Sequence, residues 1–348
     1  MIPVKGYAAK SAQSPLAPFH FERRDPGPHD VQFDILYCGV CHSDLHQVQD
    51  EWHSSIFPMV PGHEIVGRVT STGNKVKRFR PGDLAAVGCM VDSCRTCENC
   101  KEGLEQYCLN GNVLTYNSYE KENRIPTYGG YSKLIVVDED FVLKISDRFP
   151  LEAVAPLLCA GITTYSPLRH WEVGKGDRIG ILGLGGLGHM AVKIAASLGA
   201  EVTILSRSQK KEADAKRLGA HNFILTTNSD RIKTVKGYFN FILDTVSAEH
   251  DYNMYLRLLK TNGVHICVGA PPNPSEIAAF NLIGGRKSLA GSLIGGIRET
   301  QEMLDHCSEH NIVSEVEVIN IDYINKAYER MLKGDVRYRF VIDMASLK

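Results

Sequence analysis

The chain has 348 residues, enough for about two domains of ordinary size, and 43% of them are hydrophobic and 23% charged, as in a typical globular protein. Its 39 Lys and Arg residues nearly balance 40 Asp and Glu residues, so the formal net charge of -1 favours neither nucleic acid nor a membrane surface as a partner. The N-terminus lacks the segments of a signal peptide, and no run approaches the roughly 18 apolar residues of a membrane helix. We therefore expect a cytoplasmic protein.

Short apolar or alternating runs separated by Pro-Gly turn signals dominate the first 90 residues. This pattern predicts a β-rich segment rather than alternating strands and helices. Cys41 falls in a loop just after one run, and His63 stands at the start of the next. A rigid scaffold can hold metal ligands at such positions. The predicted strands are 31–37, 65–69 and 84–87.

A candidate metal site can be assembled from Cys41, His63 and the more distant Cys159. Catalytic zinc takes three protein ligands from scattered positions, and it prefers thiolate sulfur and imidazole nitrogen. The spacing alone leaves a second interpretation open, namely two half-buried cysteines and a hydrogen-bonded core histidine.

Four closely spaced cysteines form a second cluster. Close neighbours cannot pair as ordinary disulfides without strain, but a loop can wrap four thiolates around one ion. Four protein ligands leave no open position, so we predict a structural zinc, with an iron–sulfur cluster or a redox-active thiol pair as alternatives. The cluster consists of Cys94, Cys97, Cys100 and Cys108. The cysteines without a motif are interpreted as small core hydrophobes: Cys38, Cys89, Cys267 and Cys307.

The pattern changes in the second half of the chain. Residues 110–150 are loop-like apart from a predicted strand at 131–137, and an apolar helix is expected at 151–158, so we place a domain boundary near residue 150. Strands and helices then alternate, which predicts a parallel, doubly wound sheet. The predicted strands are 178–182, 202–205, 223–225, 239–243 and 264–268, and the predicted helices are 187–198, 210–218 and 252–259.

A Gly-x-Gly-x-x-Gly motif lies between the first strand and the first helix of this alternating segment. In that context glycine backbone and the helix N-terminus can receive a pyrophosphate, whereas a merely tight turn is the alternative. The predicted cofactor contacts here are Gly183, Gly185, Gly186, Leu187 and Gly188.

The end of the second strand indicates which nucleotide is bound. NAD-binding proteins of this kind carry an acid there, but this chain has Ser206, followed by Arg207 and Lys211. A hydroxyl and two cations suit the 2′-phosphate of NADP. We therefore predict NADPH as the cofactor.

Three motifs resemble those of the zinc-dependent medium-chain alcohol dehydrogenases, and most closely their cinnamyl alcohol dehydrogenase and aldehyde reductase branch. They are Gly-Val-Cys-His-Ser-Asp-Leu-His at 39–46, Gly-His-Glu at 62–64 and Leu-Cys-Ala-Gly-Ile-Thr at 158–163. The resemblance runs almost end to end. It implies an α/β protein with a β-rich GroES-like catalytic domain (1–150 and 295–348), a doubly wound Rossmann domain (151–294) and a homodimer.

The resemblance also implies roles for individual residues. Ser43 and His46 would move a proton by way of the cofactor ribose, while zinc held by Cys41, His63 and Cys159 polarises a carbonyl. Asp44 is expected to support His63, and Glu64 to approach the metal. Further expected cofactor contacts are His42, Thr163, Gly269, Ser292 and Ile294. Candidates for an apolar aldehyde cleft are Trp52, Leu293 and Ile294.

Together these patterns predict a zinc-dependent, NADPH-preferring alcohol dehydrogenase or aldehyde reductase with two zinc ions per chain. Its substrates would be aromatic or aliphatic aldehydes and primary alcohols. An NAD-dependent alcohol or polyol dehydrogenase, a non-catalytic zinc- and nucleotide-binding protein and a cysteine-based redox protein are the alternatives.

Overall fold

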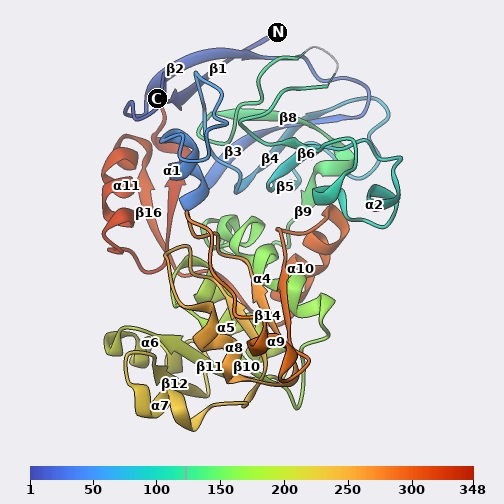
Figure 1. Ribbon diagram of the computed structural model, residues 1–348. Coiled ribbons are helices and arrows are strands. Elements are labelled where there is room, and N and C mark those ends of the chain that lie inside the picture. Colours follow the sequence, from blue (N-terminus) through green and yellow to red (C-terminus); the bar gives the residue numbers. More distant parts are fainter. Residues whose placement is uncertain (122–123) are drawn as a thin grey trace. The chain divides into compact units, whose positions relative to one another are not determined.

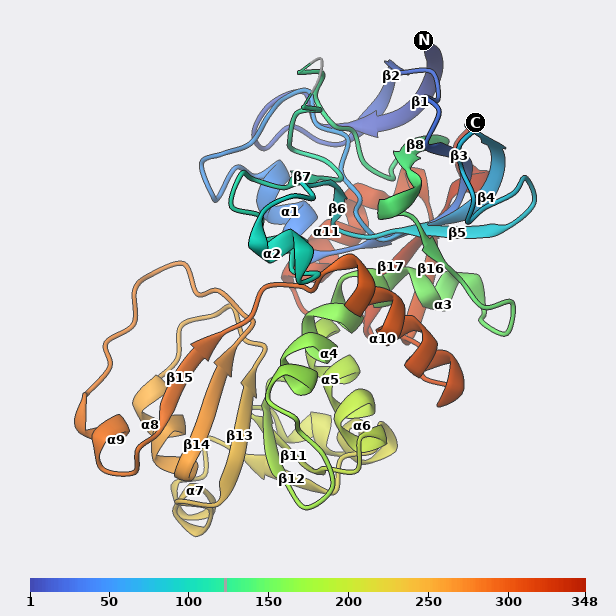
Figure 2. The ribbon, with the colours of Figure 1, turned by 90° about the vertical axis from the view of Figure 1, so that its right-hand side faces the viewer.

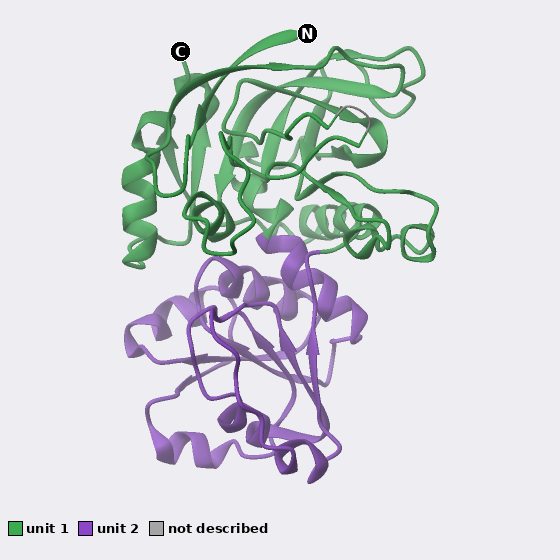
Figure 3. Cartoon of the chain, turned by 45° about the horizontal axis from the view of Figure 1, so that its top comes forward, with its two compact units in different colours: residues 1–159, 295–348 green, residues 160–294 purple. Residues whose placement is uncertain are grey.

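The computed structural model describes residues 1–121 and 124–348. These form two compact units, which we describe separately (Figure 3). Unit 1 contains Met1–Cys159 and Gly295–Lys348, and unit 2 contains Ala160–Ile294. Within the described residues, no helix has both the length and the apolar character needed to cross a membrane.

Unit 1 is built on a mixed β-sheet centred on β3 (Figure 1). β3 pairs antiparallel with β4, β8 and β17, so it joins parts of the chain that are far apart in sequence. Phe33 on β3, Ile65 on β4 and Phe340 on β17 are completely buried. The strands of this sheet are β3 (Asp30–Val40), β4 (Ile65–Thr72), β5 (Leu84–Val87), β8 (Leu134–Asp138), β9 (Leu143–Lys144), β16 (Val316–Asn320) and β17 (Arg339–Asp343).

Two smaller sheets and several short helices complete unit 1. The small sheets pair β1 (Ile2–Ala8) with β2 (Ala17–Arg23) and β6 (Met90–Asp92) with β7 (Val113–Leu114). The α-helices are α1 (His42–Val48), α2 (Glu98–Lys101), α3 (Leu151–Val154), α10 (Ile297–Glu309) and α11 (Ile324–Leu332). The 3-10 helices are η1 (Glu105–Tyr107), η2 (Glu139–Phe141), η3 (Ala155–Leu158), η5 (Ile321–Tyr323) and η6 (Met344–Ser346).

All of unit 2 is described, and six of its strands form one parallel sheet in the order β12-β11-β10-β13-β14-β15 (Figure 2). From β10 the chain first adds strands in one direction and then returns to add β13 to β15 in the other. The order therefore reverses between β10 and β13, where sheets of this kind bind their ligands. The predicted α/β class with a doubly wound sheet is confirmed.

The elements of unit 2 largely follow the predicted ranges. The strands are β10 (Arg178–Leu182), β11 (Glu201–Ser206), β12 (Asn222–Leu225), β13 (Phe239–Asp244), β14 (Leu259–Cys267) and β15 (Ser288–Gly291). The helices are α4 (Ala160–His170), α5 (Gly186–Ser197), η4 (Gln209–Lys211), α6 (Glu212–Arg217), α7 (Ser229–Thr234), α8 (Tyr252–Leu258) and α9 (Phe280–Ile283).

Several predicted boundaries differ from the structure. The helix expected at 151–158 is divided into α3 and η3, because Pro156 has no backbone N–H to continue an α-helix. These residues belong to unit 1, where Ser314 N donates to Ala153 O at 3.2 Å, so the units divide after residue 159 rather than near 150. The strand expected at 131–137 starts at Leu134, because Tyr131 and Lys133 bond instead to the segment around β1.

Candidate metal and cofactor sites

The three predicted ligands of the first metal site come together in unit 1. Cys41 is the N-cap of α1, directly after β3, and His63 lies two residues before β4. Because β3 and β4 are antiparallel, the end of one strand lies beside the start of the other. Cys159 follows η3. One potential ligand atom from each of these residues, together with a Glu64 carboxylate oxygen, lies within 4.8 Å of all the others.

The spacing of the two thiols fits a zinc ion. Sγ of Cys41 lies 3.8 Å from Sγ of Cys159. Two sulfur ligands on a tetrahedral zinc, each about 2.3 Å from the metal, are about 3.8 Å apart. A hydrogen bond from Cys159 lowers the pKa of the Cys41 thiol well below its usual value, although burial opposes the shift. The pair therefore favours a thiolate, which is the form that binds metal.

A buried carboxylate orients the imidazole of His63. Nδ1 of His63 lies 3.0 Å from Oδ1 of Asp44, whose side chain is completely buried. A carboxylate only accepts hydrogen bonds, so Nδ1 carries the proton and Nε2 is left for the metal. Asp44 Oδ2 also accepts from the backbone N–H of Cys41 at 2.8 Å and from the hydroxyl of Tyr131 at 3.3 Å. One carboxylate thus connects two of the predicted ligands.

The four-cysteine cluster also has the geometry of a zinc site. Sγ atoms of Cys94, Cys97, Cys100 and Cys108 all lie within 4.8 Å of one another, and those of Cys94 and Cys100 are 3.9 Å apart. Backbone N–H groups of Thr96 and Cys97 lower the pKa of Cys94 to about 5. The backbone of the loop before α2 therefore stabilises the thiolate form of Cys94 even without a metal ion. Four ligands would complete the coordination of the ion, as a structural site requires.

In unit 2 the glycine-rich motif joins β10 to α5, and each of its glycines has a different constraint. Gly183 has a φ of 89°, and a Cβ on Gly188 would lie 2.3 Å from the carbonyl oxygen of Gly183. Gly185 faces open space, because a Cβ there would have no atom within 4 Å. The three glycines thus meet three requirements of a dinucleotide-binding motif. Gly183 allows a tight turn, Gly188 allows close packing of helix on strand, and Gly185 leaves the backbone open to a pyrophosphate. Gly186 and Leu187 begin α5.

The end of β11 carries the residues predicted to select the nucleotide. Ser206 is the last residue of β11 and is buried, and its Oγ accepts from the backbone N–H of Ser208 at 3.2 Å. Arg207 is exposed and has no hydrogen bond or ion pair within the described residues. Nζ of Lys211 donates to the carbonyl oxygen of Leu184 at 2.6 Å, which links this end of the strand to the glycine-rich motif.

Comparison with known proteins shows which family the chain belongs to. Two family models fit the chain, one for the alcohol dehydrogenase GroES-like domain at residues 27–147 and one for zinc-binding dehydrogenases at residues 186–309. The sequence is 55% identical to NADP-dependent alcohol dehydrogenase C 1 of Mycolicibacterium smegmatis over 100% of both chains. It is 53% identical to aldehyde reductase YahK of Escherichia coli over 99% of both. The chain belongs to the family of zinc-dependent medium-chain alcohol dehydrogenases.

A solved structure identifies the branch. A cinnamyl alcohol dehydrogenase from Sorghum bicolor superposes on this dehydrogenase with a TM-score of 0.96 and 44% sequence identity, covering 99% of both chains. This likeness, together with the similarity to an aldehyde reductase, confirms the predicted branch of cinnamyl alcohol dehydrogenases and aldehyde reductases.

Glu64, which was predicted to approach the metal, has a partner that the sequence analysis missed. In this dehydrogenase Oε1 of Glu64 is paired with the guanidinium of Arg339 on β17, and both side chains are buried. Oε2 of Glu64 has no hydrogen bond within the described residues. Burial raises the pKa of Glu64 to about 7, although Arg339 opposes the shift. The carboxylate therefore lies between a fixed cation and the predicted metal ligands.

Cys89 is also part of this site, so its interpretation as a core hydrophobe is wrong. It is partly exposed, and its Sγ lies 3.7 Å from the carbonyl oxygen of Leu158. A hydrogen bond with the thiol of Cys159 lowers the pKa of Cys89. Its position depends on contacts across the fold, which no local motif reveals. Cys38 and Cys307 are buried, as predicted.

The predicted proton-transfer residues lie on α1. Oγ of Ser43 is 3.7 Å from Sγ of Cys41. His46 follows one turn later, and its Nδ1 lies 2.5 Å from Oε2 of Glu51, a contact that the sequence analysis did not predict. The ring of Trp52, which is 47% exposed, lies 5.3 Å from that of His46. His42, the first residue of α1, is exposed.

The remaining predicted cofactor and substrate residues belong to unit 2. Thr163 is buried in α4, and the backbone N–H of Gly269 donates to the carbonyl oxygen of Asp244 at 3.0 Å. Ser292 N donates to the carbonyl oxygen of Cys267 at 3.1 Å, Leu293 is exposed, and Ile294 has a φ of 37°. Their contacts with a nicotinamide or an aldehyde remain predictions.

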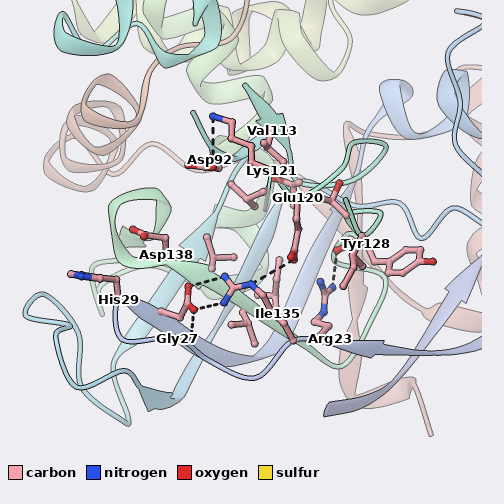
Figure 4. A pocket seen from close by; sticks show the side chains of 18 of the residues that line it. Arg23, Gly27, His29, Asp92, Val113, Glu120, Lys121, Tyr128, Ile135 and Asp138 are labelled. Atoms are coloured by element: carbon pink, nitrogen blue, oxygen red, sulfur yellow. Dashed lines mark hydrogen bonds and ion pairs between the residues drawn. The ribbon is translucent and has the colours of Figure 1, made fainter. Parts of the chain in front are cut away.

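A separate cavity of about 320 Å³ lies in unit 1 and contains none of the predicted site residues (Figure 4). Charged side chains line it, and they pair with one another. Nζ of Lys121 lies 3.7 Å from a carboxylate oxygen of Asp92, and Arg23 donates to the carbonyl oxygen of Tyr128 at 2.7 Å. We assign no function to this cavity.

Proposed function

We propose that this dehydrogenase is a zinc-dependent, NADPH-preferring enzyme that interconverts aldehydes and primary alcohols, including aromatic substrates of the cinnamyl and benzyl type. The observation that carries the proposal is the group formed by Cys41, His63 and Cys159, whose two sulfur atoms are spaced as on a tetrahedral zinc. The names of an NADP-dependent alcohol dehydrogenase and an aldehyde reductase, each more than half identical to this chain, support it.

The metal would be held by the thiolates of Cys41 and Cys159 and by Nε2 of His63. A zinc ion with one open position supplies a Lewis acid for a carbonyl or hydroxyl oxygen. The residues of the chain do the rest of the positioning. Asp44 fixes the imidazole of His63, and the two thiolates would balance the charge of a divalent ion.

Proton transfer would begin at Ser43 and end at His46. The Ser43 hydroxyl stands beside the Cys41 sulfur, where it can donate to and accept from a substrate oxygen. Glu51 holds Nδ1–H of His46, which leaves Nε2 free to take or give a proton at the protein surface. Between them, Ser43 and His46 would hold and release the proton that the substrate oxygen takes up or loses.

The second proposed zinc, bound by Cys94, Cys97, Cys100 and Cys108, has no open position and serves the fold alone. The lobe around it contains short elements such as α2 and η1, which bury little apolar surface of their own. A metal that binds only the folded lobe stabilises it directly.

The cofactor preference follows from the end of β11. Arg207 has no partner within the described residues and Ser206 offers a hydroxyl, whereas no carboxylate stands there to bind the ribose of NAD. This favours NADPH over the alternative of an NAD-dependent alcohol or polyol dehydrogenase.

We also propose a homodimer that forms through unit 2. β15 has a partner strand on one side only within the described residues, so its other edge is open. Exposed apolar side chains flank this edge, with Phe280 83%, Ile283 68% and Leu289 38% exposed. An open apolar edge strand favours pairing with a second copy.

Light scattering after size-exclusion chromatography tests the proposed dimer. Leu289→Glu on β15 should yield monomers, whereas Leu332→Glu on α11 should not.

The deciding experiment measures NADPH oxidation with cinnamaldehyde, together with zinc content, for wild type, Cys159→Ala and Cys307→Ala. Cys307 is a buried cysteine outside both metal clusters and serves as the matched control. We expect wild type and Cys307→Ala to be active with two zinc ions per chain. Cys159→Ala should stay folded, lose activity and retain only the structural zinc. Full activity of Cys159→Ala would disprove the metal assignment, and a wild type inactive with several aldehydes and both cofactors would favour a binding protein.

A further inference from the structure

A buried carboxylate lies beside the glycine-rich motif of unit 2. Asp244, the last residue of β13, pairs in register with Leu182 at the end of β10, and its side chain is 1% exposed. The next residues contact the motif itself. Thr245 donates from Oγ1 to the carbonyl oxygen of Leu182 at 2.7 Å, and a Cβ on Gly183 would lie 2.9 Å from Val246 Cγ2. An uncompensated charge on Asp244 would therefore repel any phosphate bound there.

Two histidines bond to this carboxylate. Nε2 of His250 lies 2.7 Å and Nε2 of His265 3.1 Å from Oδ2 of Asp244. Nδ1 of His250 also lies 2.8 Å from the carbonyl oxygen of Ala248. Carboxylate and carbonyl oxygens only accept, so both nitrogens of His250 must donate, which requires the imidazolium form. Nδ1 of His265 has no partner within the described residues, so His265 needs a single N–H.

The cluster is a hydrogen-bonded network rather than a third metal site. Asp244, His265 and Cys267 do bring three potential ligand atoms within 4.8 Å of one another. However, oxygen and nitrogen ligands on a tetrahedral zinc are about 3.4 Å apart, given bonds of about 2.1 Å. The 3.1 Å between Oδ2 of Asp244 and Nε2 of His265 is shorter than this and is a hydrogen-bond distance.

Arg207 follows β11, which lies on the other side of β10 from β13. β11 and β13 flank β10, so Arg207 and Asp244 both stand at the carboxyl edge of the sheet where the strand order reverses. The guanidinium of Arg207 is near enough to act on His250 and on Tyr255. It lowers the pKa of His250 against the larger opposing effect of the hydrogen bonds, and that of Tyr255 against the larger opposing effect of burial. The ring of Tyr255 lies 5.8 Å from that of His250.

We propose that His250 is a positioning residue for cofactor preference: its imidazolium cancels the Asp244 carboxylate, so that Arg207 and Ser206 can hold the 2′-phosphate of NADPH. The inference rests on the proposed NADPH preference. Without the imidazolium, a carboxylate would face a group that carries nearly two negative charges. Both cofactors carry the pyrophosphate, so an uncompensated Asp244 would weaken the binding of each. NADPH carries the 2′-phosphate in addition and would lose more affinity than NADH, so the residue acts on selectivity.

The charge on His250 makes the preference depend on pH. Burial lowers its pKa, but the bonds to Asp244 and Ala248 outweigh burial and raise the pKa above the usual value. The two acceptors around His250 require the imidazolium, which is lost as the pH rises through that raised pKa. The other titratable or charged groups around it, from β11, β13, β14, α8 and the intervening loop, are Arg207, Asp244, His265, Cys267, Glu249, Asp251, Tyr252 and Tyr255.

The test compares dissociation constants of NADPH and NADH, measured by fluorescence titration at fixed ionic strength, for four forms of the full-length protein. We expect His250→Gln to weaken NADPH binding about tenfold while NADH changes less than about twofold. His250→Lys, which keeps the charge, should retain most of the preference. Asp244→Asn added to His250→Gln should restore NADPH binding, because it removes the uncompensated carboxylate. Equal loss for both cofactors, or no rescue by Asp244→Asn, would overturn the inference.

The outcomes also separate this inference from the proposed function. If wild type shows no preference for NADPH, the cofactor assignment fails and the inference fails with it. If wild type prefers NADPH and His250→Gln keeps that preference, the inference alone is wrong. Should His250→Gln not fold, wild type still decides: its NADPH preference should fall between pH 6.5 and about 9, and a constant preference would refute the role of His250.

Discussion

Oδ1 of Asp44 lies 3.0 Å from Nδ1 of His63, and the other oxygen of the same carboxylate accepts the backbone N–H of Cys41 at 2.8 Å. One buried side chain thus sets the positions of two proposed zinc ligands. This relationship explains why Asp44 sits three residues after Cys41 on the first turn of α1, where its carboxylate can bond back to the N-cap.

Replacing Asp44 should therefore weaken metal binding. In Asp44→Asn the charged acceptor is lost, and we expect the affinity for the catalytic zinc to fall about 10- to 100-fold, with activity recovering as free zinc is raised. Activity measured in zinc buffers checks this. Asp34→Asn, an exposed acid on β3, is the matched control. If Asp44→Asn needed no more zinc than the control, the carboxylate would have no part in holding His63.

Disrupting the four-cysteine cluster should affect stability rather than chemistry. Cys97→Ser removes one of four ligands, so we expect zinc content to drop from two ions to one and the thermal unfolding midpoint to fall by about 5 °C or more. Elemental analysis and calorimetry measure both quantities. A variant that kept two zinc ions and the wild-type midpoint would show that the cluster is not a structural zinc site.

The contact between Glu51 and His46 should matter for turnover. Glu51→Ala frees Nδ1 of His46 and lets the ring adopt the other tautomer, so we expect kcat to fall about tenfold with KM for the aldehyde nearly unchanged. Glu51→Asp, which keeps a carboxylate, should recover part of the loss. Steady-state kinetics with NADPH and cinnamaldehyde provide the measurement. An unchanged kcat in Glu51→Ala would place proton transfer elsewhere.

The Asp244–His250 pair predicts how stability varies with pH. The pKa of His250 is raised in the folded protein, so its contribution is complete below the unfolded value of about 6.5 and is lost as the pH rises through the folded value. The pKa of Asp244 is lowered by its bonds to His250 and His265 despite burial, so its share is lost only in acid. The difference in thermal midpoint between wild type and His250→Gln should thus be largest near pH 6 and shrink by pH 9.

The control for that pH series is His170→Gln, which replaces an exposed histidine at the end of α4. Its difference from wild type should stay small throughout. A difference between wild type and His250→Gln that grew with pH would mean that His250 is not held as an imidazolium.

Two glycines of the nucleotide motif offer a matched pair of substitutions. Gly188→Ala places a methyl group 2.3 Å from the carbonyl oxygen of Gly183, so we expect unit 2 to be destabilised by about 3 kcal/mol. Gly185→Ala meets no atom within 4 Å and should fold normally, yet weaken NADPH binding about tenfold or more, because its methyl group occupies the proposed pyrophosphate position. Calorimetry and cofactor titration distinguish the two effects. Normal NADPH binding by Gly185→Ala would move the pyrophosphate away from this motif.

Local sequence patterns were sufficient for much of this protein. The predicted strand at 178–182 matches β10, and the expected helix that follows differs from α5 by a residue at each end, because hydrophobic periodicity and glycine positions act over a few residues. Likewise, the four cysteines are near enough in sequence that their spacing alone indicates a shared ion. The outline of both metal groups and of the nucleotide motif therefore follows from residue types and their spacing.

The tertiary structure decided the contacts between residues that are distant along the chain. Arg339 pairs with Glu64 across 275 positions, because β17 lies beside β3 in the sheet. Cys89 joins the site of Cys159, and His265 and His250 converge on Asp244, through neighbouring strands that no motif marks. The sequence by itself determined which chemical groups are present and which local elements carry them. Only strand pairing and burial decided which of these groups meet, because buried charges and thiols obtain their partners, and hence their protonation, from the whole fold.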